Sequence, residues 1–496
     1  MKPSPGSRGM NSVLFTHSYF YKLDPKQWSF KQPYPPLGTL QAAAVIRKAG
    51  FHVSLFDTAL KDNPDQINQS LKQERPAYFV IYDDGFNYLT KMCLTVMREA
   101  AFAMATFAKQ QGSIVIISSS DSTDHYEKYF QHGVDYVIRG EGEETLKELL
   151  FCLEQKMNPA QIPGLAFKHS DETTVTSSRP VLRDLDSIPL PAWDLIDLEP
   201  YRKIWNDHYG YFSLNIATTR GCPYKCNWCA KPIYGNRYNS RSPEHVVNEI
   251  EFLLKNYKPD HFWMCDDIFG LKPNWVDQFN DLIKKRGLSF RYKIQSRADL
   301  LQEESAVKAL AQSGCETVWI GAESGSQKIL DAMDKGITLH HIHEAVKLLK
   351  EQSVKVAFFL QFGYSGETKQ DIDATISMVL GLMPDEIGIS VSYPLPGTKF
   401  YENVKSQLKE KQNWTDSSDL SLMFQNTYPQ AFYKILHRYV HSRYRIQRGV
   451  NLLKGFIQKP TLLYKKDLKK IASMIYHIPI SMLQSYHLRK HSSIHG

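Results

Sequence analysis

Three cysteines within eight residues are the strongest candidates for chemistry in this chain of 496 residues. Cys222, Cys226 and Cys229 have the spacing C-x3-C-x2-C. Three thiolates on one tight loop can hold three irons of a [4Fe–4S] cluster, and the fourth iron then has no protein ligand. An open coordination position is typical of a catalytic metal site. Gly221 and Pro223 favour the sharp turn that brings the sulfurs together.

A zinc site is the main alternative for these cysteines, and unrelated free thiols are the other. Zinc would need a fourth soft or imidazole ligand nearby. His208 upstream and His245 downstream are the nearest candidates. We expect Cys265 and Cys315, which lie outside the motif, to be small buried apolar residues.

The first 150 residues alternate short apolar β-runs with helical periods. Strands are expected at 13–16, 52–56, 78–82, 113–118 and 136–139, with helices at 40–49, 89–110 and 143–154. Strands that alternate with helices predict a doubly wound parallel sheet of the flavodoxin-like kind. Ligands of such sheets bind beyond the carboxyl ends of the strands.

A second α/β series begins near residue 213. Six β-runs, each followed by a helical segment except the last, predict a full or partial parallel (β/α)6 barrel, with chemistry at the carboxyl ends of its strands. The cysteines follow its first strand. The expected domains are 10–155, a linker with a small β-element over 156–212, the barrel over 213–400, and a helical C-terminal extension over 401–496.

The cysteine motif, with Trp228 before its last cysteine, strongly resembles that of the radical S-adenosylmethionine (SAM) superfamily. The resemblance implies that SAM binds the open iron through its amino and carboxylate groups. One electron from the cluster would then cleave the sulfonium C–S bond and give a 5′-deoxyadenosyl radical.

Later strand ends also resemble parts of that family. The resemblance implies SAM contacts at Asp266, Arg297, Glu323 and Ser324, the last two within a G-x-E-S-G-S-like turn. Arg297 could pair with the SAM carboxylate in a bidentate fork, or it could bridge to Asp299 or Glu323. The carboxylates after the second strand could instead cap a helix.

A flavodoxin-like domain before such a barrel resembles the cobalamin-binding domain of one subfamily. The residues that this resemblance assigns to cobalamin are Ser118, Ser120, Asp121, Gly140 and Glu141. The pattern D-x-H-x-x-G, which supplies a histidine to cobalt in many cobalamin enzymes, is absent from the sequence. We therefore expect no histidine beneath cobalt. A domain that binds no cofactor, or binds a nucleotide, is the alternative.

The resemblance covers about residues 10–400 and implies a radical SAM enzyme that uses a [4Fe–4S] cluster, SAM and cobalamin to methylate an unactivated carbon. The subfamily also contains proteins similar to the anaerobic magnesium-protoporphyrin monomethyl ester cyclase, so a cobalamin-dependent cyclisation or rearrangement is an alternative. An iron–sulfur electron-transfer or cluster-carrier protein is the alternative from another class. The expected partners are a small-molecule or lipid-like substrate and a reductant such as flavodoxin or ferredoxin.

Charge is concentrated at the C-terminal end. Residues 401–496 carry 16 Lys+Arg and 5 Asp+Glu, whereas the rest of the chain has a net charge of −3. A basic tail favours an anionic partner, and the uncharged run over 471–488 with basic flanks favours peripheral contact with a membrane surface. A helix pair that packs on the barrel is the alternative. We recognise no RNA-binding module, so no nucleic-acid partner is expected. The absence of a signal segment or a long apolar run predicts a cytoplasmic protein.

Overall fold

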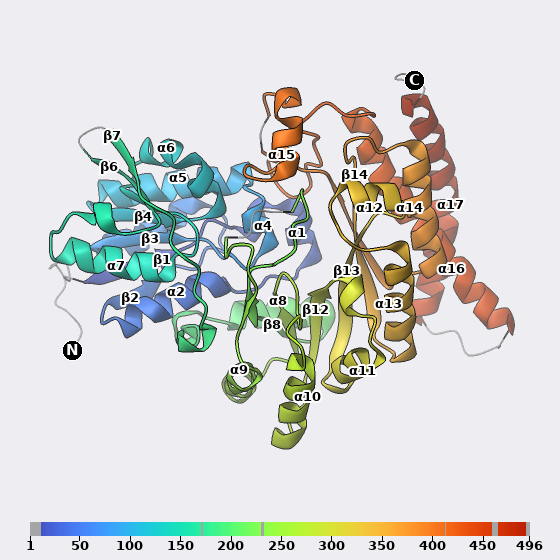
Figure 1. Cartoon of the computed structure of the whole chain (residues 1–496), viewed down its shortest axis with the longest axis horizontal. Coiled ribbons are helices and arrows are strands. Elements are labelled where there is room, and N and C mark those ends of the chain that lie inside the picture. The colour runs from blue at the N-terminus through green and yellow to red at the C-terminus, as the bar shows by residue number, and fades with distance from the viewer. Residues whose placement is uncertain (1–10, 170–171, 230–232, 412, 459–464, 493–496) are drawn as a thin grey trace.

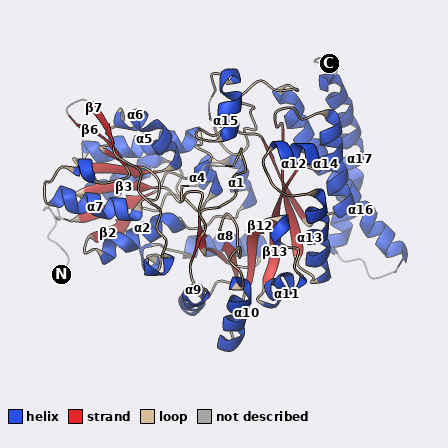
Figure 2. Cartoon of the chain, in the orientation of Figure 1, coloured by secondary structure: helices blue, strands red, loops and turns tan. Residues whose placement is uncertain are grey.

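The computed structural model describes residues 11–169, 172–229, 233–411, 413–458 and 465–492. Its strands form two large sheets, which Figure 2 shows as two separate groups with helices around them. In Figure 1 the first sheet lies on the left, the second lies right of centre, and the last two helices form the right edge.

The first sheet has seven strands in the order β2-β1-β3-β4-β5-β6-β7. The first five are parallel and have the flavodoxin-like order 2-1-3-4-5. Its strands are β1 (Ser12–Thr16), β2 (His52–Leu55), β3 (Tyr78–Tyr82), β4 (Ile114–Ser118), β5 (Tyr136–Ile138), β6 (Leu165–His169) and β7 (Glu172–Val175). The central strands are buried on both faces, which explains their continuous apolar runs.

Helices cover both faces of this sheet. They are α2 (Leu37–Lys48), α3 (Ile67–Glu74), α5 (Thr95–Gln110), α6 (Ser120–Phe130) and α7 (Glu143–Glu154), whereas the short α1 (Pro25–Phe30) and α4 (Tyr88–Lys91) contribute Trp28 and Leu89 to the core of the second unit. The carboxylate of Asp84 accepts hydrogen bonds from the first backbone N–H groups of α2, at Leu37 (3.2 Å) and Gly38 (3.0 Å). A charge after β3 therefore fixes the start of a helix that follows β1.

Strands β6 and β7 belong to the first sheet, which the sequence does not predict. The pattern predicts a small β-element within a linker, whereas both strands extend the first sheet antiparallel to β5. The edge of β5 has free backbone groups that β6 pairs, which accounts for this placement. Helix α8 (Glu199–Tyr209) then leads to the second sheet.

The second sheet has six parallel strands in the order β15-β14-β13-β12-β11-β8. Its outer strands β8 and β15 are not paired with each other, so the sheet is a half barrel, the partial form of the expected barrel. Its strands are β8 (Ser213–Ile216), β11 (His261–Met264), β12 (Arg291–Ser296), β13 (Cys315–Glu323), β14 (Lys355–Phe362) and β15 (Glu386–Val391).

The helices of this unit pack on its convex face. They are α9 (Pro243–Asn256), α10 (Trp275–Arg286), α11 (Glu304–Gln312), α12 (Gln327–Ala332), α13 (Leu339–Glu351) and α14 (Lys369–Leu382), followed by the short α15 (Lys399–Val404). Phe279 of α10 packs edge-on against Tyr292 of β12, with ring centroids 6.0 Å apart. A separate two-stranded ribbon, β9 (Thr219–Arg220) and β10 (Asn239–Ser240), follows β8.

Two long helices end the described chain, α16 (Gln430–Gln458) and α17 (Lys465–Ser492). They lie side by side (Figure 1), and α16 packs on α14 and on the edge strand β15. The Tyr444 hydroxyl, on α16, donates to the backbone oxygen of Pro384 (2.6 Å). No helix of the described residues is both long enough and apolar enough to cross a bilayer.

Candidate cluster and cofactor site

The three motif cysteines lie on one loop just beyond the carboxyl end of β8 and the short β9. All three thiols are free. Cys229 is accessible at its surface, although it lies deep enough in the protein for burial to raise the pKa of its thiol to about 12. The accessible surface of Cys229 leaves its sulfur open to a bound metal or cluster.

Gly221 makes the turn into this loop possible. Its φ is +79°, and a Cβ there would lie 2.1 Å from the backbone oxygen of Arg237. A side chain at this position would therefore displace the loop, so the glycine expected from the sequence is required by close backbone approach.

Asn227, inside the motif, anchors the cysteine loop to the second half of the barrel. Its side-chain amide donates to the backbone oxygen of Ala332 (2.7 Å), and its side-chain oxygen accepts from the hydroxyl of Tyr364 (2.9 Å). Its backbone N–H donates to Met333 (3.0 Å), and its backbone oxygen accepts from Phe400 (2.8 Å). The sequence analysis does not single out Asn227, because its partners are more than 100 residues away.

Asp266, a predicted SAM contact, supports the start of the loop. Its carboxylate accepts from the backbone N–H groups of Thr218 (2.7 Å) and Thr219 (2.8 Å) and from the Thr218 hydroxyl (2.6 Å). Burial outweighs these hydrogen bonds and raises its pKa to about 6. Its contact with SAM stays a prediction.

Arg297 lies against the cysteines. Its guanidinium makes a two-point ion pair with Asp299 (2.9 and 3.0 Å), which is one of the bridges that the sequence allows. It also stacks on the ring of Tyr224 at 3.6 Å, and Nη1 lies 3.9 Å from the sulfur of Cys226. One edge of the guanidinium is thus fixed by protein, while another faces the loop.

Glu323 and Lys335 form a buried ion pair beside the same loop, with Nζ 2.8 Å from Oε1. Glu323 has a left-handed φ of +56°, a strained conformation for a side chain with a Cβ. The Lys335 ammonium also lies 5.8 Å from the ring centre of Trp228 and interacts electrostatically with Cys226. Lys335 lies in the loop after α12, where no sequence motif marks it.

Ser324, the next predicted SAM contact, is buried against α14. Its hydroxyl is 3.1 Å from that of Thr375 and accepts from the backbone N–H of Ser326 (3.1 Å). The serine therefore holds the turn after β13 on its supporting helix, and a role in binding SAM stays a prediction.

The donor set fits an iron–sulfur cluster. Cys222, Cys226 and Cys229 interact electrostatically, and burial raises the pKa values of Cys222 and Cys229. Among the described residues, no three His, Cys, Asp or Glu side chains converge on a point where one metal ion would sit. A [4Fe–4S] cluster takes one thiolate per iron, so its ligands need not converge in that way. Arg297 and Lys335 would offset the negative charge of the cluster and its thiolates.

Loops from the carboxyl ends of both sheets meet at this site. Lys91 of α4 pairs with Asp267, after β11, at 2.6 Å. Arg220, just before the motif, pairs with Glu141 and with Glu143 (2.7 Å), both after β5. All three members of this second group are buried. Glu141, a predicted cobalamin contact, thus connects the first sheet to the cysteine loop.

The other predicted cobalamin residues lie at the carboxyl edge of the first sheet. Ser118 ends β4, and the buried hydroxyl of Ser120 has no hydrogen-bond partner. Asp121 is held by Arg98 (2.5 and 2.7 Å) and by the Tyr129 hydroxyl (2.7 Å). Gly140 has a φ of +81°, which suits a glycine.

A crevice of about 260 Å³ lies between these strand ends and the segment after the cysteines. Tyr82, Ser118 and Gly140 line one side, and Ile233 and Tyr234 line the other. The nearby Ser120 hydroxyl, which has no hydrogen-bond partner, and Gly140 suit the binding of a polar edge of a ligand. The volume is below that of ordinary small-ligand pockets, about 300–1,000 Å³, so a corrin fits only if Ile233 and Tyr234 move away.

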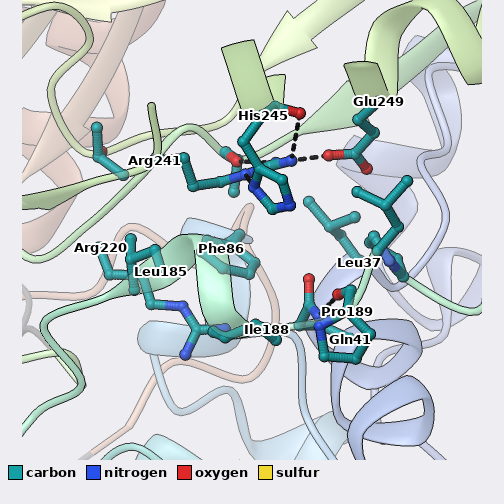
Figure 3. A pocket seen from close by; sticks show the side chains of 14 residues that line it. Leu37, Gln41, Phe86, Leu185, Ile188, Pro189, Arg220, Arg241, His245 and Glu249 are labelled. Atoms are coloured by element: carbon teal, nitrogen blue, oxygen red, sulfur yellow. Dashed lines mark hydrogen bonds and ion pairs between the residues drawn. The ribbon is translucent and has the colours of Figure 1, made fainter. Parts of the chain in front are cut away.

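A larger hollow of about 390 Å³ lies at the seam between α2, the segment 185–191 and α9. Figure 3 shows Arg241 reaching Glu249 (2.5 Å) and His245 across this hollow. The Gln41 amide donates to the backbone oxygen of Pro189 (2.5 Å). These charged and polar groups already have hydrogen-bond or ion-pair partners within the protein. We therefore interpret the hollow as a structural interface between the packed segments. His245, one suggested zinc ligand, is engaged here, and His208 lies on α8.

Comparisons with known proteins agree with this geometry. Residues 216–379 match the model of the Radical SAM superfamily. An uncharacterized methyltransferase of Pyrococcus horikoshii is 32% identical over 283 residues, which cover 57% of this chain and 60% of the relative. The anaerobic magnesium-protoporphyrin IX monomethyl ester cyclase of Cereibacter sphaeroides is 25% identical over 392 residues, 76% of this chain and 61% of the relative. This chain thus spans about 60% of the length of these relatives.

A solved structure of the cobalamin-dependent SAM radical enzyme OxsB, with aqua-cobalamin bound, superimposes with a TM-score of 0.75 at 16% identity. The match covers 96% of this chain and 73% of that one. Residues 216–379 therefore match a radical SAM domain. The chain as a whole has the fold of the cobalamin-dependent radical SAM enzymes, with a flavodoxin-like sheet, a half barrel and a helical C-terminal part.

Proposed function

We propose that this protein is a radical SAM enzyme that uses cobalamin to methylate an unactivated carbon of a small-molecule or lipid-like substrate. The observation that carries the proposal is the loop of three free thiols at the carboxyl end of β8, with Arg297 and Lys335 against it. Similarity to methyltransferases supports methyl transfer as the outcome.

The chain's own residues have distinct roles in this proposal. Cys222, Cys226 and Cys229 hold the cluster. The free edge of Arg297 would bind the SAM carboxylate, and Glu323 would face SAM. The cluster supplies the electron that splits SAM, and cobalamin supplies the methyl group.

On the cobalamin side, the strand ends of the first sheet would hold the corrin. Ser118 and Ser120 offer hydroxyls to its amide side chains, and Gly140 allows the backbone to approach closely. Asp121 and Glu141 act by fixing the neighbouring loops, because both carboxylates are engaged by arginines.

The test uses full-length protein reconstituted anaerobically with iron, sulfide and hydroxocobalamin. We expect about four irons and one cobalt per chain, and 5′-deoxyadenosine from SAM after addition of dithionite. Cys226→Ala should lose the iron and the product. Cys315→Ala, at a buried cysteine outside the motif, is the matched control and should keep both.

The outcomes separate the alternatives. A fully loaded cluster that forms no 5′-deoxyadenosine would favour an electron-transfer or cluster-carrier protein. Iron without cobalt would remove cobalamin from the proposal. Radical cyclisation is the second candidate activity, favoured by the similarity to the magnesium-protoporphyrin cyclase over 76% of this chain. Product masses distinguish the two, because methylation adds 14 mass units and oxidative ring closure removes hydrogen. A flavodoxin or ferredoxin is the proposed physiological reductant.

We further propose that α17 docks on an anionic membrane surface. Its outward face is apolar, with Ile475, Met482 and Leu483 exposed by 61%, 70% and 60%. The sequence places Lys469 and Lys470 before this stretch and Arg489 and Lys490 after it. Apolar side chains between basic flanks suit lipid with negative headgroups better than a neutral partner.

Liposome flotation tests the docking. The full chain should float with vesicles that contain phosphatidylserine, and less with pure phosphatidylcholine. Ile475→Glu combined with Met482→Glu should abolish flotation, whereas Lys203→Glu, on the exposed face of α8, should not. Absence of flotation, or a stable dimer that the same double variant dissociates, would overturn the membrane assignment.

A further inference from the structure

The strand register of the half barrel separates its side chains into two faces. On the face toward α9–α14, residues such as Phe262, Tyr292 and Phe358 are fully buried. The opposite, inner face has half-buried positions in its middle, although its residues Asn215, Ala357 and Gln361 are buried. Six residues on this inner face matter here: Trp263, Lys293, Gln295, Trp319, Phe359 and Gly388.

Aromatic rings make the walls of this inner face. Trp319 and Phe359 stack with centroids 4.6 Å apart and planes at 29°. Trp263 packs on Tyr34, from the loop before α2, at 4.8 Å. A Cβ on Gly388 would lie 3.2 Å from the ring of Trp319, so the backbone of Gly388 packs closely against the Trp319–Phe359 pair and a larger side chain there would press on the rings. Such ring surfaces bind planar or apolar groups.

Within the described part of the chain, Lys293 makes no direct ion pair on this inner face, although the carboxylate of Glu386, on the same face of the sheet, acts on its ammonium electrostatically. Its ammonium lies 5.4 Å from the ring centres of both Tyr34 and Trp263. Burial lowers its pKa to about 8. Ring faces offset only part of the cost of removing an ammonium from water. A ligand anion would give the ammonium the direct ion pair that Glu386 does not make.

The position of Lys293 also gives the ligand a direction. Arg297, which faces Cys226, follows on the same strand four residues later. At about 3.3 Å per residue this separates the two cations by about 13 Å along the strand. An anionic group at Lys293 would thus lie away from the cluster, and the apolar body of the ligand would extend toward it.

Resting on the proposed function, we propose that the substrate is an aromatic or otherwise planar apolar compound with an anionic group, which Lys293 binds. Trp319 and Phe359 hold its apolar part below the cysteine loop. Lys293 is a binding residue in this proposal and takes no part in the chemistry.

Two probes that differ by one charged group test the proposal. Isothermal titration calorimetry on the full-length, cluster-loaded protein would use 8-anilinonaphthalene-1-sulfonate and its uncharged parent, N-phenyl-1-naphthylamine. Lys293→Met should weaken binding of the sulfonate by about tenfold or more, and change binding of the neutral probe by less than about twofold. Lys355→Met is the matched control, because Lys355 lies on the same face at its exposed rim and already pairs with Glu316 (2.6 Å).

A second variant tests the location. Gly388→Leu presses on the ring of Trp319 and should weaken both probes, with folding checked by thermal melting. Equal affinity of wild type and Lys293→Met for the sulfonate overturns the proposal, as does unchanged binding in a folded Gly388→Leu protein. These measurements need no turnover, so their failure is distinct from a lack of 5′-deoxyadenosine formation, which would refute the proposed function.

Discussion

Arg297, just after β12, and Lys335, in the loop after α12, place two positive charges beside the cysteine loop. Both are buried, and each has a carboxylate partner, Asp299 for the arginine and Glu323 for the lysine. Buried charges that are already paired stay oriented at little further cost. The residues therefore form a fixed electrostatic environment around Cys226.

Loss of the Lys335 charge should make the cluster harder to reduce. Lys335→Met removes a cation that favours the reduced, more negative cluster, so its midpoint potential should fall by tens of millivolts. Lys335→Arg should keep a potential close to that of the wild type. Redox titration followed by electron paramagnetic resonance measures the shift. An unchanged potential in Lys335→Met would show that this charge does not act on the cluster.

At the scale of elements, residues from strand ends and from neighbouring loops hold the cysteine loop in position. Asp266 holds the beginning of the loop from β11, and Asn227 holds its end from the region after α12 and from Tyr364. The loop is thus fixed by partners on both sides of the half barrel.

Removal of the Asn227 side chain should loosen the cysteine loop. Asn227→Ala leaves the hydroxyl of Tyr364 with one fewer acceptor and should lower the free energy of unfolding by about 1–3 kcal/mol. Iron retained after gel filtration should fall as well. Asn206→Ala, on the exposed part of α8, provides the control. Full iron occupancy in a destabilised Asn227→Ala protein would mean that the anchor stabilises the fold alone.

Glu367, in the turn after β14, gives the fold a pH-dependent element. It is fully buried, one carboxylate oxygen has no partner, and burial raises its pKa from 4.5 to about 8. Between these values the native state holds a proton that the unfolded chain releases, so the free energy of unfolding falls as pH rises across that window.

A neutral replacement should remove that dependence. Glu367→Gln has nearly the same shape and no charge, so it should flatten the loss of stability between pH 5 and pH 8. At about 1.4 kcal/mol per pKa unit, the difference should reach a few kcal/mol. Urea unfolding at several pH values measures it, and an identical pH slope in both proteins would contradict the assignment.

At the scale of the whole molecule, buried ion pairs connect the two sheets. Arg220 precedes the cysteine motif in the second unit, and its partners Glu141 and Glu143 follow β5 of the first. The cofactor candidates of both units therefore lie at one junction, with the carboxyl ends of both sheets turned toward it.

Removal of the arginine alone from this junction should destabilise the protein. Arg220→Met leaves two buried carboxylates without their cation and should lower the free energy of unfolding by about 3–5 kcal/mol. Adding Glu141→Gln and Glu143→Gln removes the unpaired charges and should recover part of the loss. Chemical unfolding monitored by fluorescence and by circular dichroism compares the variants. A triple variant no more stable than Arg220→Met would refute the charge argument.

Local patterns predict much of this molecule. The six strand positions of the half barrel follow from apolar runs between helical periods, and the cysteine spacing specifies its own chemistry. Gly221 can be predicted for the same reason, because the tight turn requires a glycine at that position itself. The sequence does not predict which strands β6 and β7 pair with, because a short strand has no local pattern that specifies the sheet edge that it joins.

Partners that are distant in the chain were decided only by the three-dimensional fold. Lys335 meets Cys226, Arg220 meets Glu141, and Lys293 meets the ring of Tyr34 because sheet register and packing bring these segments together. Spacing along a chain encodes contacts within a turn or a loop, where few conformations compete. Contacts across a hundred residues depend on the energy of the whole packed structure, so the charges around the cysteines, and the aromatic face below them, become visible only in the tertiary structure.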